Sequence, residues 1–298
     1  MRGDQHSGFH LDARVVARSF GAASAGYDAA ADLQAEVRAE LLARVDELQA
    51  QRARILDLGC GTGAGAAALK RRFPRARVVA ADIAPAMVAL ARRRSRFWRP
   101  IETVVADCHE LPFPDACFDL VFTNLMLQWA EPLDAALEQI RRVLRPGGLL
   151  LASSFGPETL QELRAAWEAA DGQVHVNRFV DMHDLGSALV RAGFVEPVLD
   201  TDRHRRWYSE PVALMRGLQA IGAHNLNAGR PRGLTGRRAY GRMTAAYESL
   251  REARGLPATW QVVYATAWAG EHAPPGIHVA DAETVVSLAS LRRRIAGR

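Results

Sequence analysis

Apolar positions change period repeatedly along the chain, which predicts alternating helices and buried strands. Leu33, Val37 and Leu41 recur at helical spacing and predict a helix over most of residues 11–50. Short apolar runs then predict strands, with helical patterns between most of them. The predicted strands are 54–58, 77–81, 103–106, 118–123 and 149–153, and the predicted helices are 64–73, 85–94 and 133–144. This alternation predicts a parallel α/β sheet with right-handed crossovers.

The order of elements is looser after residue 155. The predicted elements there are helices at 158–170 and 182–192 and strands at 194–199 and 261–268. Between residues 201 and 256 strand signals are weak and arginine is dense, so we predict an inserted, mostly helical segment. A basic tail follows Glu271.

Composition excludes several classes of protein. The 298 residues are 49% apolar and 24% charged, which is typical of a globular chain that can bury a full core. A run of about 18 apolar residues is missing, so no membrane span is expected. The three cysteines, Cys60, Cys108 and Cys117, form no CxxC pair, which argues against a disulfide scaffold or zinc knuckle and fits a reducing compartment. The first ten residues lack the apolar region of a secretory signal, and a cytoplasmic location is expected.

The charge balance is positive, with a formal net charge of +5. Lys70 is the one lysine among 38 basic residues, a preference for arginine that fits a GC-rich coding bias. The positive balance itself permits an acidic partner, whether nucleic acid, anionic membrane or acidic protein.

The strongest chemical signal is a glycine-rich turn between a predicted strand and a predicted helix. Residues 55–63 read ILDLGCGTG, and glycines at such a turn let the backbone approach a ligand closely. Asp82 ends the next strand, 19 residues after Gly63, where a carboxylate can bind both hydroxyls of a ribose. The spacing is GxGxG rather than GxGxxG and no P-loop lysine follows, so there is little provision for a pyrophosphate.

From residue 54 to about residue 154 the chain resembles the class I S-adenosylmethionine (SAM) methyltransferases. Besides the glycine turn and Asp82, the resemblance rests on ADC at 106–108, FDLV at 118–121 and LRPGG at 144–148. It implies a Rossmann-like α/β fold with a seven-stranded sheet, helices on both faces and a helical lid. It also implies SAM as cofactor and S-adenosylhomocysteine as product. The expected division is an N-terminal helical segment (1–50), a SAM-binding core (51–202), a helical insertion forming a substrate lid (203–257), a returning core strand (258–270) and a C-terminal tail (271–298).

The same resemblance implies roles for residues near the ends of the predicted strands. SAM carries an amine, a diol, an exocyclic amine and a cation, which suit carboxylates and carbonyls. Asp57 and the turn residues Gly59, Cys60, Gly61 and Gly63 would hold the methionine part. Asp82 would bind the ribose, and Ile83 and Asp107, with Cys108 beside it, would contact the adenine. Asn124 would face the sulfonium, and Tyr27 would close over the cofactor. No cluster with metal-ligand spacing is evident, so no metal is expected.

Outside this core the chain resembles the malonyl-acyl carrier protein O-methyltransferases of biotin synthesis. The matching segments are FGAASAGYD at 20–28, TNLMLQW at 123–129, VNRF at 176–179 and LQAIGAHNLNAGR at 218–230. The resemblance runs from about residue 18 to residue 270. It implies methylation of the free carboxylate of a malonyl group on acyl carrier protein, so that fatty-acid synthesis elongates the product as an ordinary primer.

A carboxylate is already a nucleophile at pH 7, so the implied reaction requires no general base. The sequence accordingly shows no Ser/His/Asp triad order. Orientation of the malonyl carboxylate is expected from Arg178, whose guanidinium can clamp it, with Gln128, Trp129 and His224 as secondary donors.

Eight arginines in the predicted insertion could steer an acidic carrier protein toward the site. They are Arg203, Arg205, Arg206, Arg230, Arg232, Arg237, Arg238 and Arg242. A solvated helix face with coding-biased composition is the alternative interpretation. Nucleic acid and membrane are not expected as partners, and the oligomeric state is not readable.

Two other functions share the same core. A methyltransferase of a small metabolite, such as a quinone precursor, would need a base or metal for a hydroxyl substrate. Related sequences also include a complex I assembly factor that hydroxylates an arginine of a partner protein. A mitochondrial presequence would favour that function, but Arg14 and Arg18 lie near Asp4 and Asp12 and weaken that interpretation.

Overall fold

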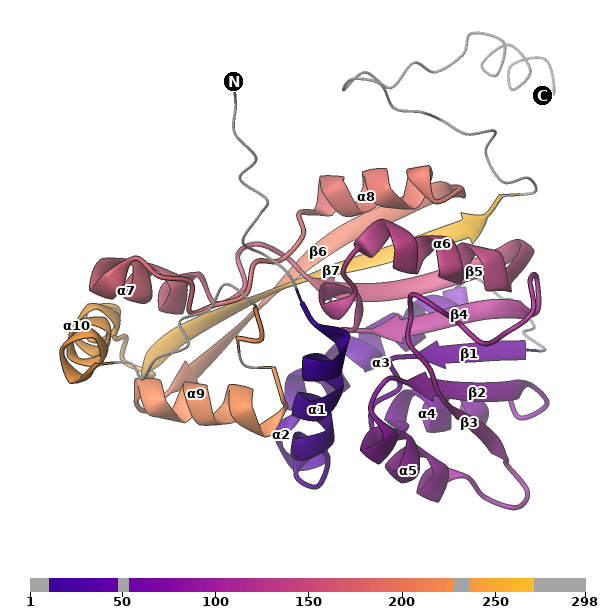
Figure 1. Ribbon diagram of the computed structural model, residues 1–298, viewed down its shortest axis with the longest axis horizontal. Coiled ribbons are helices and arrows are strands. Elements are labelled where there is room, and N and C mark those ends of the chain that lie inside the picture. The colour runs from indigo at the N-terminus through magenta and orange to yellow at the C-terminus, as the bar shows by residue number, and fades with distance from the viewer. Residues whose placement is uncertain (1–10, 48–53, 224, 228–235, 271–298) are drawn as a thin grey trace, which may run out of the picture.

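The computed structural model describes residues 11–47, 54–223, 225–227 and 236–270 (Figure 1). Its centre is a seven-stranded sheet with the order β3-β2-β1-β4-β5-β7-β6. The strands are β1 (Arg54–Leu58), β2 (Arg77–Asp82), β3 (Ile101–Val105), β4 (Phe118–Asn124), β5 (Leu144–Phe155), β6 (Phe194–Tyr208) and β7 (Leu256–Ala269). Strands β1 to β5 are parallel, and β7 runs antiparallel to both β5 and β6. This is the class I SAM-methyltransferase fold that the sequence predicts.

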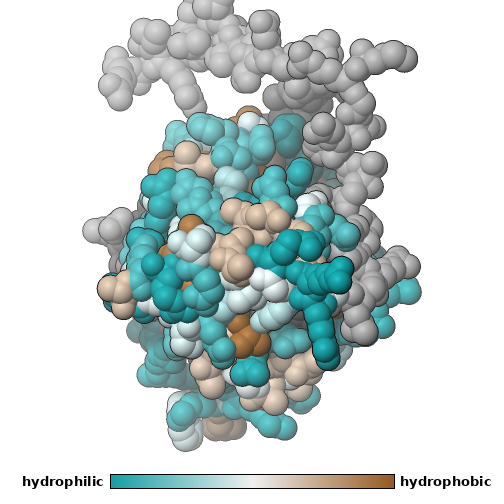
Figure 2. All heavy atoms as spheres, turned by 90° about the vertical axis from the view of Figure 1, so that its left-hand side faces the viewer, coloured by the Kyte–Doolittle hydropathy of each residue, from teal (hydrophilic) through white to brown (hydrophobic). Residues whose placement is uncertain are grey.

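Helices cover both faces of the sheet because successive residues of the buried strands point to opposite sides. The helices are α1 (Ala13–Ala23), α2 (Tyr27–Ala30), α3 (Asp32–Glu47), α4 (Ala64–Arg72), α5 (Pro85–Arg94), α6 (Leu133–Val143), α7 (Gln161–Asp171), α8 (Met182–Arg191), α9 (Pro211–Ala220) and α10 (Arg237–Glu248), with a short 3-10 turn at Leu127–Trp129. Ile55 of β1 packs in one apolar cluster with α3, α4, α7, α9 and α10. Leu56 packs in the other cluster with α6 and α8. The end of the molecule formed by α7, α9 and α10 faces the viewer in Figure 2, where hydrophilic side chains surround a few apolar ones.

The parallel strands position the functional groups. Register pairs Leu58 of β1 with Ala81 of β2, and Asn124 of β4 with Ser153 of β5. The carboxyl ends of β1, β2 and β4 therefore meet at one edge of the sheet, where open α/β sheets bind ligands.

The first predicted helix is instead three helices, α1, α2 and α3. Asp12 caps α1 by accepting a hydrogen bond from the backbone N–H of Arg14. The helix ends at Ala23, and the turn through Gly26 redirects the chain, so that α1 leaves the apolar face of α3 and lies over the sheet edge. A helical period alone did not reveal this break.

The chain also continues as a strand where the sequence predicts the helical insertion. Strand β6 runs to Tyr208, so Arg203, Arg205 and Arg206 lie on an edge strand rather than in a lid. Their carboxylate partners are Glu158, Glu252 and Glu36, respectively. Because β6 is an edge strand, its solvent-facing positions tolerate charged residues. The sequence of this segment therefore lacks the regular apolar alternation by which a strand is recognised. The prediction that these three arginines lie in a helical insertion is therefore wrong.

The remaining arginines of that group divide between α10 and the undescribed segment. Arg237, Arg238 and Arg242 lie on α10, and Arg230 and Arg232 fall outside the described residues. The predicted tail from residue 271 also falls outside them. Among the described helices, none is long and apolar enough to cross a membrane.

Candidate active site

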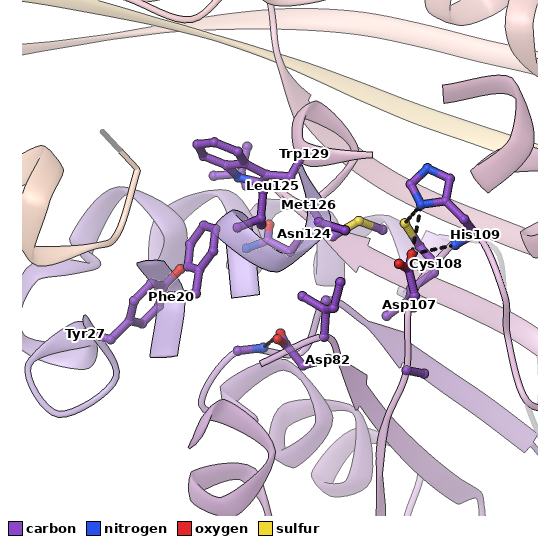
Figure 3. A pocket seen from close by; sticks show the side chains of 17 residues that line it. Phe20, Tyr27, Asp82, Asp107, Cys108, His109, Asn124, Leu125, Met126 and Trp129 are labelled. Atoms are coloured by element: carbon purple, nitrogen blue, oxygen red, sulfur yellow. Dashed lines mark hydrogen bonds and ion pairs between the residues drawn. The ribbon is translucent and has the colours of Figure 1, made fainter. Parts of the chain in front are cut away.

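A cavity of about 700 Å³ opens at the carboxyl ends of β1, β2 and β4 (Figure 3). Its polar groups come from the strand ends, with Asp82, Asp107 and Asn124 among them. Its apolar wall is formed by Phe20 of α1 and by Trp129, whose rings meet edge to face with centroids 5.3 Å apart.

A second cavity of about 880 Å³ adjoins the first. Both are lined by Tyr27, Gly59, Gly61 and Asn124, so they form two compartments around the glycine turn. Burial, with the nearby Asp82 charge as a smaller cause, raises the pKa of Tyr27 to about 12, so its hydroxyl keeps its proton at neutral pH.

Asp82 is fixed at the end of β2 by two backbone donors. Gly61 N–H donates to Oδ2 and Ala84 N–H donates to Oδ1, each at 2.9 Å. Burial raises the pKa of this carboxyl, whereas the two hydrogen bonds favour its charged form. Because each carboxylate oxygen has a second lone pair, Asp82 can still accept from both hydroxyls of a ribose.

The glycine turn needs its glycines for steric reasons. Gly59 has a φ of +69°, and a Cβ there would lie 2.3 Å from Cγ of Met126. Met126 lines the first cavity, so a side chain at Gly59 would push into the cofactor compartment. Gly63 also has a positive φ and packs against Ala91 of α5, so its backbone brings α4 and α5 together.

The second cavity carries opposite charges on facing elements. Asp57 of β1 and Arg38 of α3 both line it, with the amide of Gln34 beside them. Asp57 accepts a hydrogen bond from the backbone N–H of Ala66, but its Oδ2 is buried without a hydrogen-bond partner among the described residues. An orphaned carboxylate oxygen and a guanidinium suit the ammonium and the carboxylate of an amino acid. The residues present therefore fit the methionine end of SAM.

Burial raises the pKa of Asp57 to about 7. A neutral acid cannot pair with an ammonium group, so ligand binding must release a proton below this pH. We therefore expect the affinity for S-adenosylhomocysteine to fall roughly tenfold between pH 7.0 and pH 5.5. Calorimetric titrations across this range measure the change. The Asp57→Asn variant is the control, and an equal decline in that variant would assign the pH dependence to another group.

The wall of the first cavity formed by residues 107–109 contains a local hydrogen-bond cluster. His109 binds Asp107 Oδ1 through its backbone N–H at 2.9 Å and through ring Nδ1 at 2.8 Å. Its other ring nitrogen lies 3.2 Å from the carbonyl oxygen of Pro132. Burial raises the pKa of Cys108 to about 12, so this thiol keeps its proton at neutral pH and is not a nucleophile. Asp107 is thus held in a fixed orientation at the cavity wall.

The structure brings together only part of the predicted site. The first cavity is lined by Tyr27, Gly59, Gly61, Asp82, Ile83, Asp107, Cys108, Asn124 and Trp129, and the second adds Asp57 and Cys60. Gly63 lies just behind the turn as the N-cap of α4. Asn124 is fixed between the compartments, since its Nδ2 donates to the Gln34 carbonyl at 3.1 Å and its Oδ1 accepts from Ser153 Oγ at 3.0 Å.

Among the predicted substrate-binding residues, Gln128 and Arg178 do not line the first cavity. Gln128 donates from Nε2 to the Leu125 carbonyl at 2.7 Å, and its Oε1 lies 3.4 Å from Ser154 Oγ, so its side chain is engaged elsewhere. Arg178 lines a separate cavity beside Arg164. Its position therefore does not support direct clamping of a carboxylate in the first cavity. His224 falls outside the described residues.

Sequence reasoning missed Arg38 and Phe20 as site residues. Arg38 lies at the border of the apolar face that identified the helix, where a charged residue is ordinary and gives no signal of a ligand. A faint signal was available, because Gln34 and Arg38 are four residues apart and share one helix face. Phe20 begins one of the segments that carry the family resemblance, but only the fold shows that it reaches the cofactor cavity.

Comparisons with known proteins agree with this geometry. A family model described as a methyltransferase domain matches residues 56–152. The solved structure of the YcgJ protein from Bacillus subtilis superposes with a TM-score of 0.56 at 16% identity, covering 78% of this chain and 98% of that one, which shows the shared fold. The malonyl-[acyl-carrier protein] O-methyltransferase of Laribacter hongkongensis is 47% identical over 268 residues, covering 87% of this chain and 90% of the relative. The enzyme of the same name from Halorhodospira halophila is also 47% identical, over 87% of this chain and 88% of the relative. The chain therefore belongs to the malonyl-[acyl-carrier protein] O-methyltransferase family.

Proposed function

We propose that the protein transfers a methyl group from SAM to the free carboxylate of a malonyl thioester on acyl carrier protein, as a step of biotin synthesis. The observation that carries this proposal is the 47% identity to two enzymes of that name over nearly the whole chain. The identity extends well beyond residues 56–152, which match the general methyltransferase domain. Substrate choice resides largely outside that domain, so a match of this extent supports the substrate as well as the reaction class.

The cofactor is held by groups of both compartments. Asp57 and Arg38 bind the amino-acid end, Asp82 binds the ribose hydroxyls, and Ile83 and Asp107 contact the adenine. Bound SAM supplies an electrophilic methyl group on a sulfonium. Because Asn124 is fixed where the two compartments meet, the reacting centre lies beside it.

The residues around this centre exclude water and orient the substrate. A carboxylate nucleophile and a sulfonium neutralise each other's charge as the methyl group moves. An apolar wall disfavours the two separated charges more than the less charged transition state, which lowers the barrier. Phe20, Trp129 and Met126 supply this wall, and none of them has to accept a proton. Trp129 remains the proposed contact for the malonyl group from the cavity side.

The carrier protein is proposed to dock at the end of the molecule formed by α7 and α10 (Figure 2). Arg237 and Arg238 are exposed on α10, and no carboxylate lies within ion-pair distance of them among the described residues. Arg178 is exposed close by, and its neighbour Phe179 packs on Phe155 at the end of β5, with ring centroids 5.6 Å apart. We therefore propose Arg178 as an anion contact for the incoming carrier or its arm, outside the methyl-transfer cavity.

The test is transfer of label from methyl-labelled SAM to malonyl-acyl carrier protein, with malonyl-coenzyme A and acetyl-acyl carrier protein as comparisons. We expect label only on malonyl species, as a base-labile ester, and more on the carrier-bound form. Binding of S-adenosylhomocysteine without any labelled malonyl ester would contradict the proposed substrate. Label on a hydroxyl-bearing metabolite or on a partner protein would instead support one of the two alternative functions.

A further inference from the structure

A tight turn between α5 and β3 projects two aromatic side chains into solvent. Arg99 N–H donates to the Arg96 carbonyl at 2.9 Å and Arg96 N–H donates back at 3.4 Å, which closes the turn around Phe97 and Trp98. These two side chains are 96% and 75% exposed, the highest values among the large apolar residues described. Contiguous exposed apolar side chains rimmed by polar residues mark protein or membrane interaction sites.

The positive charge of the chain is concentrated around this turn. Between Lys70 and Glu102 the sequence holds ten basic and two acidic residues, a formal net charge of +8. The whole chain carries +5, so the remainder carries −3. One of the two acidic residues, Asp82, is buried in the cofactor site. The chain is therefore electrostatically polarised, with its basic part on this side.

Six of these arginines have no counter-charge among the described residues. They are Arg71, Arg75, Arg92, Arg93, Arg96 and Arg99, which have no carboxylate within 4.0 Å, whereas Arg77 pairs with Glu102 and Arg94 with Asp28. The arginines of β6, by contrast, are paired with carboxylates. A coding bias toward arginine explains the residue type but not this difference in pairing.

Helix dipoles explain only part of the cluster. Arg71, Arg92 and Arg93 lie in the last turns of α4 and α5, where cations are favourable. Arg96 and Arg99 lie beyond α5, and a dipole does not account for two exposed aromatic residues between them. We call Arg71, Arg92, Arg93, Arg96, Phe97, Trp98, Arg99 and the half-exposed Val105 the basic-aromatic edge.

We propose that the basic-aromatic edge binds an anionic phospholipid surface, with Phe97 and Trp98 entering the headgroup region. Aromatic side chains favour the membrane–water interface, and arginines favour anionic headgroups. The turn presents two adjacent, highly exposed aromatic residues, which a bilayer accepts without a matching pocket. An acidic protein would need a separate pocket for each ring.

The position of the turn that carries Phe97 and Trp98 is compatible with activity. The turn leads into the amino end of β3, whereas the cofactor cavity lies at the carboxyl ends of the parallel strands. Membrane contact through the turn therefore leaves the cavity open to a carrier protein arriving from solution.

The experiment is sedimentation of the full chain with vesicles of phosphatidylglycerol and phosphatidylethanolamine, compared with vesicles of phosphatidylcholine alone. At low ionic strength we expect binding to the anionic vesicles only. Binding should shift the tryptophan fluorescence to the blue, and Trp98→Phe should lose this shift. Phe97→Ala/Trp98→Ala and Arg96→Glu/Arg99→Glu are each expected to weaken vesicle binding at least tenfold. Both variants should bind S-adenosylhomocysteine as the unmodified chain does, which shows that they are folded.

The matched control is Arg237→Glu/Arg238→Glu on α10. It makes the same change of charge at exposed positions that are distant in sequence from the basic-aromatic edge. We expect it to weaken vesicle binding less than threefold. Absence of binding to anionic vesicles overturns the proposal, and so does an equal loss in the control, which would indicate attraction by net charge alone. The proposal would also be overturned if the edge variants lost binding to acyl carrier protein or to single-stranded nucleic acid while their vesicle binding stayed unchanged. That result would assign the edge to the partner whose binding was lost.

Discussion

Replacement of Asp82 by asparagine is expected to weaken SAM binding by about a hundredfold, or about 2.7 kcal/mol. The carboxylate accepts from Gly61 and Ala84 and still has lone pairs for the ribose. An asparagine side chain has one acceptor oxygen, so its NH₂ group would face a backbone donor on one side. It also removes the charge that strengthens the hydrogen bonds to the hydroxyls, a loss of about 1.5–3 kcal/mol for a buried charged acceptor. Isothermal titration with S-adenosylhomocysteine measures the effect.

The control for this substitution is Asp184→Asn on the exposed side of α8, which removes the same charge away from the site. It should leave the affinity unchanged within a factor of two. Urea unfolding separates binding from folding, because Asp82→Asn should lower the free energy of unfolding by only about 1–2 kcal/mol through the unpaired donor. A loss of affinity below threefold in a folded Asp82→Asn variant would show that the ribose is not bound there.

The sequence predicted the parts of the fold that depend on local pattern. Strands β1 and β4 are buried almost throughout, so their apolar runs stood out between helical periods. The glycine turn and Asp82 could be assigned to one site because the carboxyl ends of parallel strands meet at the same edge of the sheet, regardless of side-chain contacts. These two facts account for most of the predicted cofactor-binding residues that line the cavities.

The sequence could not predict features that depend on contacts between distant segments. Strand β6 is an exposed edge stabilised by pairing with β7 and by ion pairs such as Arg206 with Glu36, 170 residues apart in sequence. Arg178 and Gln128 were chosen by chemical type, but the neighbours of each side chain decide where it points. Arg38 illustrates the converse, because its proposed role depends on α3 packing on β4 and β5, which brings Arg38 to the cavity that Asp57 lines. Local pattern identifies such a helix without showing which polar residue it presents to the site.

The largest expected effect on stability comes from Gly63→Ala in the glycine turn. Gly63 has a φ of +83°, which costs an alanine about 1–2 kcal/mol. A Cβ there would also lie 2.7 Å from both Cα and Cβ of Ala91, whose side chain is completely buried. The clash involves helix backbone rather than a flexible side chain, so α4 and α5 would have to separate. We expect the free energy of unfolding to fall by about 3–4 kcal/mol, measured by urea denaturation.

Gly147→Ala separates the two causes of this loss. Gly147 has a φ of +70°, but nothing lies within 4 Å of the position that its Cβ would take. Only the backbone cost applies there, so the expected loss is about 1 kcal/mol. The difference between the two variants measures the close approach of α5 to the glycine turn.

Because this approach also fixes the turn that holds Asp82 through the Gly61 N–H, Gly63→Ala should weaken S-adenosylhomocysteine binding as well, whereas Gly147→Ala should not. Equal stabilities of the two variants would mean that α4 and α5 are not in close contact at Gly63, and an unchanged affinity in Gly63→Ala would separate the packing of the turn from its role in binding.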